Sequence, residues 1–177
     1  MLTRINIKDI ILSHFKTLRA VGQDKGIAVI DFILFLLIPI TCSIILVYYD
    51  IGFKSLTSDI ITAISILAGF LFNLLAIIYT SLDKIKIEGL NSEIRKQFVL
   101  ELHSNISYNI LLSIFIIPLL LLYKIDVYKC WFDKTLLGLN YFLLFSFFLT
   151  LLMILKRIFI LLDSSGNNHT EDIQNEE

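Results

Sequence analysis

The stretch ISILAGFLFNLLAIIY, residues 64–79, decides the fold class because it lies inside an uncharged run from Ile60 to Leu82. A run of this length is sufficient for a helix to cross the hydrocarbon core of a bilayer. Four uncharged runs share this character: Phe32–Tyr49, Ile60–Leu82, Leu102–Tyr123 and Thr135–Leu155. A backbone in hydrocarbon must satisfy its own hydrogen bonds, so each run predicts a helix. The sequence therefore predicts an all-α, multi-pass membrane protein with four transmembrane helices.

Composition supports the same class. Of 177 residues, 56% are hydrophobic and 18% are charged, whereas soluble chains carry about 25% charged residues. We expect a cytosolic or interfacial amphipathic segment over 1–27, a transmembrane domain over 28–162 and a tail over 163–177. Within the transmembrane domain, the spans are expected at about 30–49, 60–82, 102–123 and 135–157, with a cytosolic helical loop over 83–101.

Lysine and arginine residues are distributed unequally between the two sides of this expected bundle. Eleven lie before the first span, in the loop after the second or at the end of the fourth: Arg4, Lys8, Lys16, Arg19, Lys25, Lys84, Lys86, Arg95, Lys96, Lys156 and Arg157. Four lie on the other side: Lys54, Lys124, Lys129 and Lys134. Cytosolic loops of membrane proteins carry the excess of these residues. The bias predicts an inner-membrane protein with both termini and the middle loop in the cytosol.

The two terminal segments have different patterns. Ile7, Ile10, Ile11 and Phe15 recur at helical spacing among basic residues. This predicts an amphipathic helix that lies in the inner interface or packs on a cytosolic loop of the same chain. Beyond Asp163 the chain reads DSSGNNHTEDIQNEE, with five acids and no Lys or Arg. Such a composition predicts a disordered acidic tail.

Small and polar residues form a stripe along one face of the second span, with spacings of three or four. We name this stripe the seam, and it comprises Thr62, Ser65, Gly69, Asn73, Ala76 and Thr80. Membrane helices approach one another closely at small residues, and an interhelical bond from Asn73 is worth roughly 1 kcal/mol. The seam is expected to pack on another span of this chain, on another subunit, or around a pore. Leu71, on the opposite side, is expected to face lipid.

The loop between the second and third spans carries an apolar stripe, which we name the loop face. Its residues fall three or four apart: Ile87, Leu90, Ile94 and Phe98. This pattern predicts an amphipathic helix that continues into the third span without a break. The stripe must be buried against the bundle, the membrane surface or a partner, and we take it as a candidate partner-binding face.

The sequence contains little that would support catalysis. The four runs have no Asp, Glu, Lys or Arg, the residues on which proton-coupled carriers and intramembrane enzymes rely. His14, His103 and His169 lie in three different segments, with no Cys or carboxylate at a metal-ligand spacing. The GxSxG, Walker and HExxH patterns are absent. We therefore expect a protein that is not an enzyme, with no catalytic residues, no cofactor and no metal.

Two functions from different classes remain. The first is a regulatory or scaffolding membrane subunit that senses events at the bilayer and acts through a cytosolic protein encoded nearby. The alternative is a small oligomeric pore or membrane-perturbing effector. The large share of cytosolic sequence favours the first, and the seam permits the second. In both cases we expect a homo-oligomer in the lipid bilayer that does not itself bind nucleic acid.

The layout resembles that of small four-span membrane proteins encoded in bacterial antiviral defence loci, and it is most similar to the membrane subunit of Kiwa-type systems. The resemblance covers the whole chain and rests on its length, four spans, cytosolic termini and richness in Ile, Asn and Lys. The most distinctive string is AGFLFNLLAIIY, residues 68–79. The resemblance implies an inner-membrane oligomer that detects phage attack and works through a cytosolic nucleic-acid-binding effector. It assigns no functional residue.

Overall fold

A computed structural model describes residues 7–17, 25–85, 92–125 and 130–174. Its elements in chain order are α1 (Ile7–Thr17), α2 (Lys25–Tyr48), the short 3-10 helix η2 (Lys54–Leu56), α3 (Thr57–Ile85), α4 (Ser92–Lys124) and α5 (Cys130–Gln174). No strand occurs among the described residues. The all-α class predicted from the sequence is confirmed.

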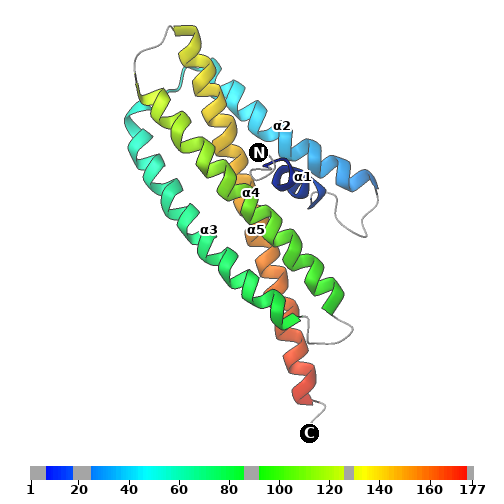
Figure 1. The fold of residues 1–177 in the computed structure, drawn as a ribbon. Coiled ribbons are helices and arrows are strands. Elements are labelled where there is room, and N and C mark those ends of the chain that lie inside the picture. Colours follow the sequence, from blue (N-terminus) through cyan, green and yellow to red (C-terminus); the bar gives the residue numbers. More distant parts are fainter. Residues whose placement is uncertain (1–6, 18–24, 86–91, 126–129, 175–177) are drawn as a thin grey trace.

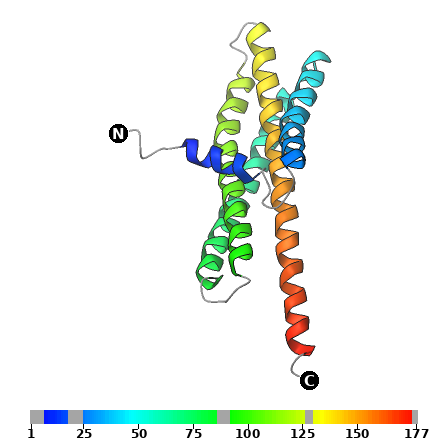
Figure 2. The ribbon, with the colours of Figure 1, turned by 90° about the vertical axis from the view of Figure 1, so that its right-hand side faces the viewer.

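The long helices form an elongated bundle with α4 and α5 in the middle (Figure 1). α4 packs against α3 on one side and α5 on the other, and α2 packs against α5. The order across the bundle is therefore α3, α4, α5, α2, so that α2 and α3 are sequence neighbours but lie on opposite sides of the central pair. α1 packs against α4 and runs across the bundle rather than along it (Figure 2).

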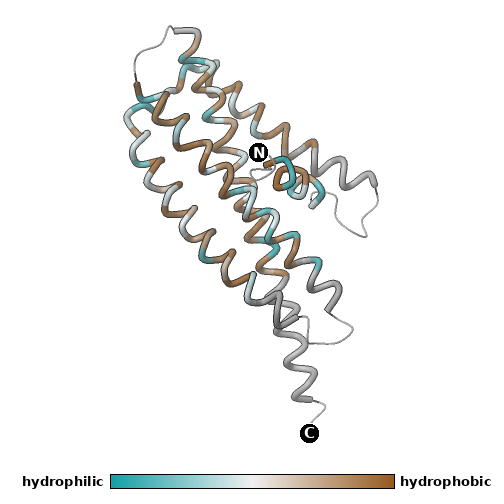
Figure 3. The backbone as a smooth tube through the Cα atoms, viewed as in Figure 1, coloured by the Kyte–Doolittle hydropathy of each residue, from teal (hydrophilic) through white to brown (hydrophobic). Residues whose placement is uncertain are grey.

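Three helical segments are long and apolar enough to cross a membrane: Lys54–Thr80, Val99–Lys124 and Phe132–Ile160. α2 contributes a shorter apolar stretch, Phe35–Tyr48, within the described residues. Hydrophobic residues follow these helices along most of their length, while hydrophilic residues gather on α1 and where α2 turns into α3 (Figure 3). The helices thus have the length and composition of membrane-spanning segments.

The core lies along α4 and is closed by one face each of α3 and α5. Ile106, Ile116 and Leu120 of α4 are fully buried, as is Phe147 of α5. α3 presents Ile64, Leu71 and Ile78, seven residues apart, to this core. Leu71 is 4% exposed, so the expectation that it faces lipid is wrong. A seven-residue repeat returns to nearly the same helix face, so a straight stripe of large side chains meets α4.

The end of the bundle that holds η2 is closed by aromatic rings and ion pairs. Phe53 contacts the rings of Tyr123 and Tyr141, with centroids 5.1 and 4.9 Å away. A β-carbon on Gly52 would stand 3.1 Å from the Tyr123 hydroxyl, so the turn passes close to that ring. Around this cluster, charged side chains pair across the connections: Lys54 with Asp133 at 3.1 Å and Lys134 with Asp50 at 3.3 Å.

The start of α4 agrees with the sequence-based expectation, whereas the end of α5 does not. α4 runs without interruption from Ser92 through Pro118 to Lys124, which confirms the expected continuity of the loop helix with the third span from Ser92 onward. The expected disorder from residue 163 is corrected, because α5 continues as a helix to Gln174. Helix nucleation is costly but propagation is not, so polar residues that follow a long, already formed helix can extend it.

Candidate functional site

The last turn of α1 buries polar side chains rather than apolar ones. His14 is 0% exposed and Thr17 is 6% exposed, whereas Leu12 on the same helix is 57% exposed. α1 packs against α4. Burial of a polar group costs free energy unless the group is hydrogen-bonded. The partners of these two side chains therefore define the site.

Asn105 of α4 holds both of them. Its Oδ1 lies 2.8 Å from Nδ1 of His14 and 2.7 Å from Oγ1 of Thr17. Because a carboxamide oxygen is an acceptor, Nδ1 of His14 carries the proton and donates it, and the neutral ring keeps its lone pair on Nε2. Thr17 Oγ1 also lies 2.7 Å from the backbone carbonyl oxygen of His14. Its single proton serves one of the two acceptors at a time.

Arg157 of α5 connects the same turn of α1 to α4. Its guanidinium is paired with the carboxylate of Glu101, and the two side chains are 13 and 18% exposed. Its Nη2 also donates to the backbone carbonyl oxygen of Thr17 at 2.9 Å. α1, α4 and α5 are thus joined by a continuous set of polar contacts, which we name the inner polar cluster: His14, Thr17, Glu101, Asn105 and Arg157.

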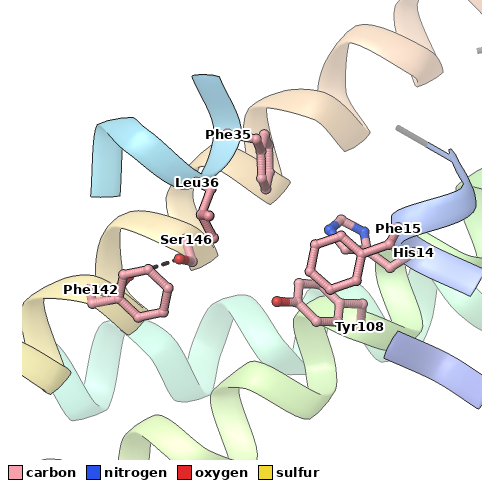
Figure 4. A pocket seen from close by; sticks show the side chains of 7 residues that line it. All are labelled: His14, Phe15, Phe35, Leu36, Tyr108, Phe142 and Ser146. Atoms are coloured by element: carbon pink, nitrogen blue, oxygen red, sulfur yellow. Dashed lines mark hydrogen bonds between the residues drawn. The ribbon is translucent and has the colours of Figure 1, made fainter. Parts of the chain in front are cut away.

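The His14 ring lies between aromatic side chains and borders a small cavity. It stacks on Tyr108 of α4 with a centroid distance of 3.8 Å and an interplanar angle of 5°, and Phe35 of α2 lies 5.8 Å away. The cavity has a volume of about 40 Å³. Side chains from four helices converge on it (Figure 4): His14, Phe15, Phe35, Leu36, Tyr108, Phe142 and Ser146.

Several buried polar atoms at this end of the bundle have no hydrogen-bond partner among the described residues. They are Nε2 of His14, Nδ2 of Asn105 and both side-chain polar atoms of Asn109. All three residues are 0% exposed. Leaving such a group unpaired costs about 1–3 kcal/mol. The site therefore carries unpaired buried acceptors and donors, of which only His14 belongs to a residue that lines the cavity, and such groups call for a partner such as water.

Electrostatics keep the His14 ring neutral. Burial lowers the pKa of His14 from 6.5 to about 4, the hydrogen bond with Asn105 opposes this shift, and the positive charge of Arg157 adds to it. At neutral pH the site therefore contains an uncharged imidazole with one free acceptor nitrogen. No group of three His, Cys, Asp or Glu side chains that could hold a metal ion occurs in the described part of the chain.

The seam lies elsewhere, on the outside of α3. All six of its residues are exposed, and a β-carbon on Gly69 would meet no atom within 4 Å. The hydroxyls of Thr62, Ser65 and Thr80 bond to carbonyl oxygens of their own helix. The structure therefore does not pack the seam on another span of this chain, because the large side chains of the opposite face occupy the contact with α4.

The loop face is described in part. Ile87 and Leu90 lie outside the described residues. Ile94 and Phe98 belong to α4, while their side chains lie outside what the structure describes. The structure thus places half of this face on the same helix as Glu101 and Asn105. Its proposed role stays a prediction.

Sequence reasoning missed the inner polar cluster, although two signals for it were present. Glu101, Asn105, Asn109 and Ser113 follow one another at intervals of four, which places them in a row on one helix face. His14 interrupts the apolar spacing of α1, following Ile7 and Ile10 at helical intervals. A polar residue on an apolar stripe indicates either a tolerated solvated position or a buried partner. The burial in the structure identifies the latter.

Comparison of the chain with protein-family models, with curated proteins and with solved structures finds no match. The inner polar cluster and the two helix faces described above are therefore the basis for inferring its function.

Proposed function

We propose that this chain is a non-enzymatic, four-span subunit of the bacterial inner membrane that passes an event in the bilayer to a cytosolic protein. The observation that carries the proposal is the joining of α1, α4 and α5 through the inner polar cluster. α1 is fixed to the bundle by side-chain contacts as well as by its chain connection to the first span. It is bonded to Asn105 of α4 and to Arg157 of α5, so a tilt of either helix moves α1 with it.

The positions of charged and amphipathic residues support the membrane placement. α1 meets α4 at Asn105, and from there to Lys124 the helix is about 30 Å long, which matches the hydrocarbon core of a bilayer. At the Lys124 end, paired lysines and carboxylates lie around η2. α1 then lies in the inner interface. α2, the first span in chain order, joins α3, α4 and α5 in crossing the membrane, and the excess of Lys and Arg favours both termini in the cytosol.

α4 supplies the route to the cytosol. Its 33 residues form one helix, about 50 Å long, so the part that precedes Asn105 projects beyond α1 (Figure 1). This projecting part includes Ile94 and Phe98 of the loop face. A rigid helix carries a change of tilt in the membrane to its cytosolic end, where we place the contact with a protein partner encoded nearby.

The seam supports a homo-oligomer. Asn73 is exposed on the outside of α3, where lipid offers its carboxamide no hydrogen bond. Two copies of α3 facing one another at Gly69 and Asn73 would give each carboxamide a partner and let the backbones approach. The resemblance in layout to membrane subunits of antiviral loci adds the biological setting, a response to phage attack. In that setting the partner, rather than this chain, binds nucleic acid.

Co-purification tests the proposal. We expect the double variant Ile94→Ser with Phe98→Ser to insert and oligomerise as the unmodified chain does, yet to lose the co-expressed neighbour-encoded protein and the protection against phage in a plaque assay. Exposed Leu152 and Leu155 on α5 supply the matched control, and Leu152→Ser with Leu155→Ser should retain the partner. Retention of the partner by the loop-face variant would refute its role.

The exposed polar face of α3 favours a second candidate, a small oligomeric pore. Copies arranged with Ser65, Asn73 and Thr80 inward would line a narrow polar path. Reconstitution into planar bilayers distinguishes the two functions. Conductance that Asn73→Leu abolishes would favour the pore, and a silent bilayer would favour the signalling subunit.

A further inference from the structure

We propose that Nε2 of His14 is a proton-binding site, and that a proton bound there releases α1 from α4 and α5. The ring is 0% exposed, and Nδ1 already donates to Asn105. A second proton can therefore bind at Nε2 alone. No described residue accepts a hydrogen bond from that nitrogen. Protonation thus creates a buried cation with an unpartnered N–H group, which is far more costly than the neutral ring.

A small cavity lies beside the buried ring. Its lining includes His14, and its volume of about 40 Å³ exceeds the roughly 10–15 Å³ that a cavity needs to hold one water molecule. Its wall includes the polar side chains of Tyr108 and Ser146 (Figure 4). Nε2 itself is closed to water while α1 is docked, so a proton binds there when α1 separates from α4, and protonation then favours the released state.

The charged groups around the ring do not compensate a positive charge. α4 contributes Glu101 and Tyr108, but the Glu101 carboxylate is already paired with Arg157. Arg157 of α5 carries a like charge, and its guanidinium lies close by, where it bonds to the Thr17 carbonyl oxygen. α2 contributes the uncharged Phe35 and Leu36 to the same cavity. The charged side chains of α1 itself are exposed: Lys8, Asp9 and Lys16.

The direction of the pH effect follows from linkage. In docked α1 the pKa of His14 is about 4, whereas a solvated ring titrates at its usual 6.5. The undocked state therefore binds protons first as the pH falls. Docking is at full strength above pH 6.5 and weakens as the pH falls toward 4. From the difference between these two pKa values, the equilibrium constant for docking falls on the order of thirtyfold between pH 7.5 and pH 5.

This release is a property of the chain alone and does not depend on the partner of the proposed function. It names a trigger for that function, however. A membrane breach that lets protons into the cytosol acidifies the face on which α1 lies. Undocking then removes the contacts of α1 with Asn105 and Arg157, and the cytosolic surface of α4 becomes available beside them.

Hydrogen exchange of the full-length protein in lipid nanodiscs tests the proposal. Protection factors, corrected for the intrinsic pH dependence of exchange, are compared at pH 7.5 and pH 5 for amides of α1 and for core amides around Ile116. We expect the protection of α1 to fall roughly thirtyfold and that of the core to stay constant. Unchanged protection of α1 in the unmodified protein would overturn the proposal.

Two histidine variants assign the effect. His14→Gln keeps an N–H donor for Asn105 and cannot titrate, so its α1 protection should be the same at both pH values. His103→Gln, on α4, should behave as the unmodified protein does. A His14→Gln variant that still loses protection in acid refutes the assignment. If His14→Gln leaves α1 unprotected at both pH values, ¹⁵N-histidine NMR of the unmodified protein replaces this comparison. A His14 ring that titrates near 6.5 while α1 stays protected would also refute the assignment.

Discussion

The hydroxyl of Ser43 in α2 donates a hydrogen bond to the backbone carbonyl oxygen of Gly138 in α5, with 2.7 Å between the two oxygens. At this point a β-carbon on Gly138 would stand 3.4 Å from Cγ2 of Val47 and 3.6 Å from Oγ of Ser43. The two helices thus approach one another at a residue without a side chain, as small-residue contacts between membrane helices do. This contact attaches α2 to the bundle.

Gly138→Leu should separate α2 from α5 and destabilise the fold by about 1–3 kcal/mol, the usual range for overpacking. Gly69→Leu is the matched control, because nothing lies within 4 Å of a β-carbon there. Thermal unfolding in detergent at a dilution that keeps the protein monomeric measures both. Equal losses for the two variants would contradict the close contact at Gly138.

Leu71→Ala should destabilise the monomer by about 2 kcal/mol, the low end of the range for a buried leucine. In water part of that cost is the lost hydrophobic free energy of burying the side chain, and this part is small when the unfolded helix lies in lipid. Leu71 is 4% exposed, whereas its neighbour Phe70 is 66% exposed and faces away from the bundle. Phe70→Ala should therefore leave the unfolding transition in place. A greater loss for Phe70→Ala would mean that the packed face of α3 has been misassigned.

Asn73→Leu should weaken self-association of the chain in the bilayer. The lost interhelical bond is worth roughly 1 kcal/mol, which corresponds to about a fivefold change in the dissociation constant. Energy transfer between labelled copies in liposomes measures it. Phe72→Ala, exposed on α3 but outside the seam, should associate as the unmodified chain does. If both variants associate equally, α3 is not the interface between copies.

Arg157→Met should undock α1, because it removes the donor to the Thr17 carbonyl oxygen and leaves the Glu101 carboxylate unpaired at 18% exposure, so that release of α1 would hydrate it. Breaking such a largely buried pair costs about 3 kcal/mol. Adding Glu101→Met should recover the part of the loss that comes from the unpaired carboxylate, because both charges are then absent, while the bond to the Thr17 carbonyl oxygen stays lost. Exposed Lys156→Met serves as the control. Protection of α1 amides is the readout, and a double variant no better than Arg157→Met would show that the ion pair is not the cause.

The sequence predicted the helices well because their determinants are local. Uncharged length identified α3, α4 and α5, and the spacing of Ile7, Ile10 and Ile11 identified α1. These features depend on the properties of each segment and on its solvent, so no partner helix has to be known.

Which face of each helix meets another depends on the partner, and the sequence could not supply it. Small residues favour close approach, so Gly69 and Asn73 were natural choices for the packed face of the second span. α4 instead packs against the face of α3 that holds Ile64 and Leu71. The inner polar cluster was hidden for the same reason. Its residues lie in three segments, and a pattern within one segment does not reveal a bond to another.

The hydrogen bonds of α1 also determine the order in which its contacts form during synthesis. His14 and its partner Asn105 are 91 residues apart, and Thr17 and its partner Arg157 are 140 residues apart. At a synthesis rate of about 5–20 residues per second, α1 leaves the ribosome roughly 7–28 s before Arg157 does. His14 and Thr17 meet Asn105 earlier in that interval, whereas the Thr17 carbonyl oxygen gains its donor only when Arg157 emerges. Attachment of α1 is therefore completed only late in synthesis, and a chain interrupted within α5 before Arg157 would hold this helix through its contacts with α4 alone.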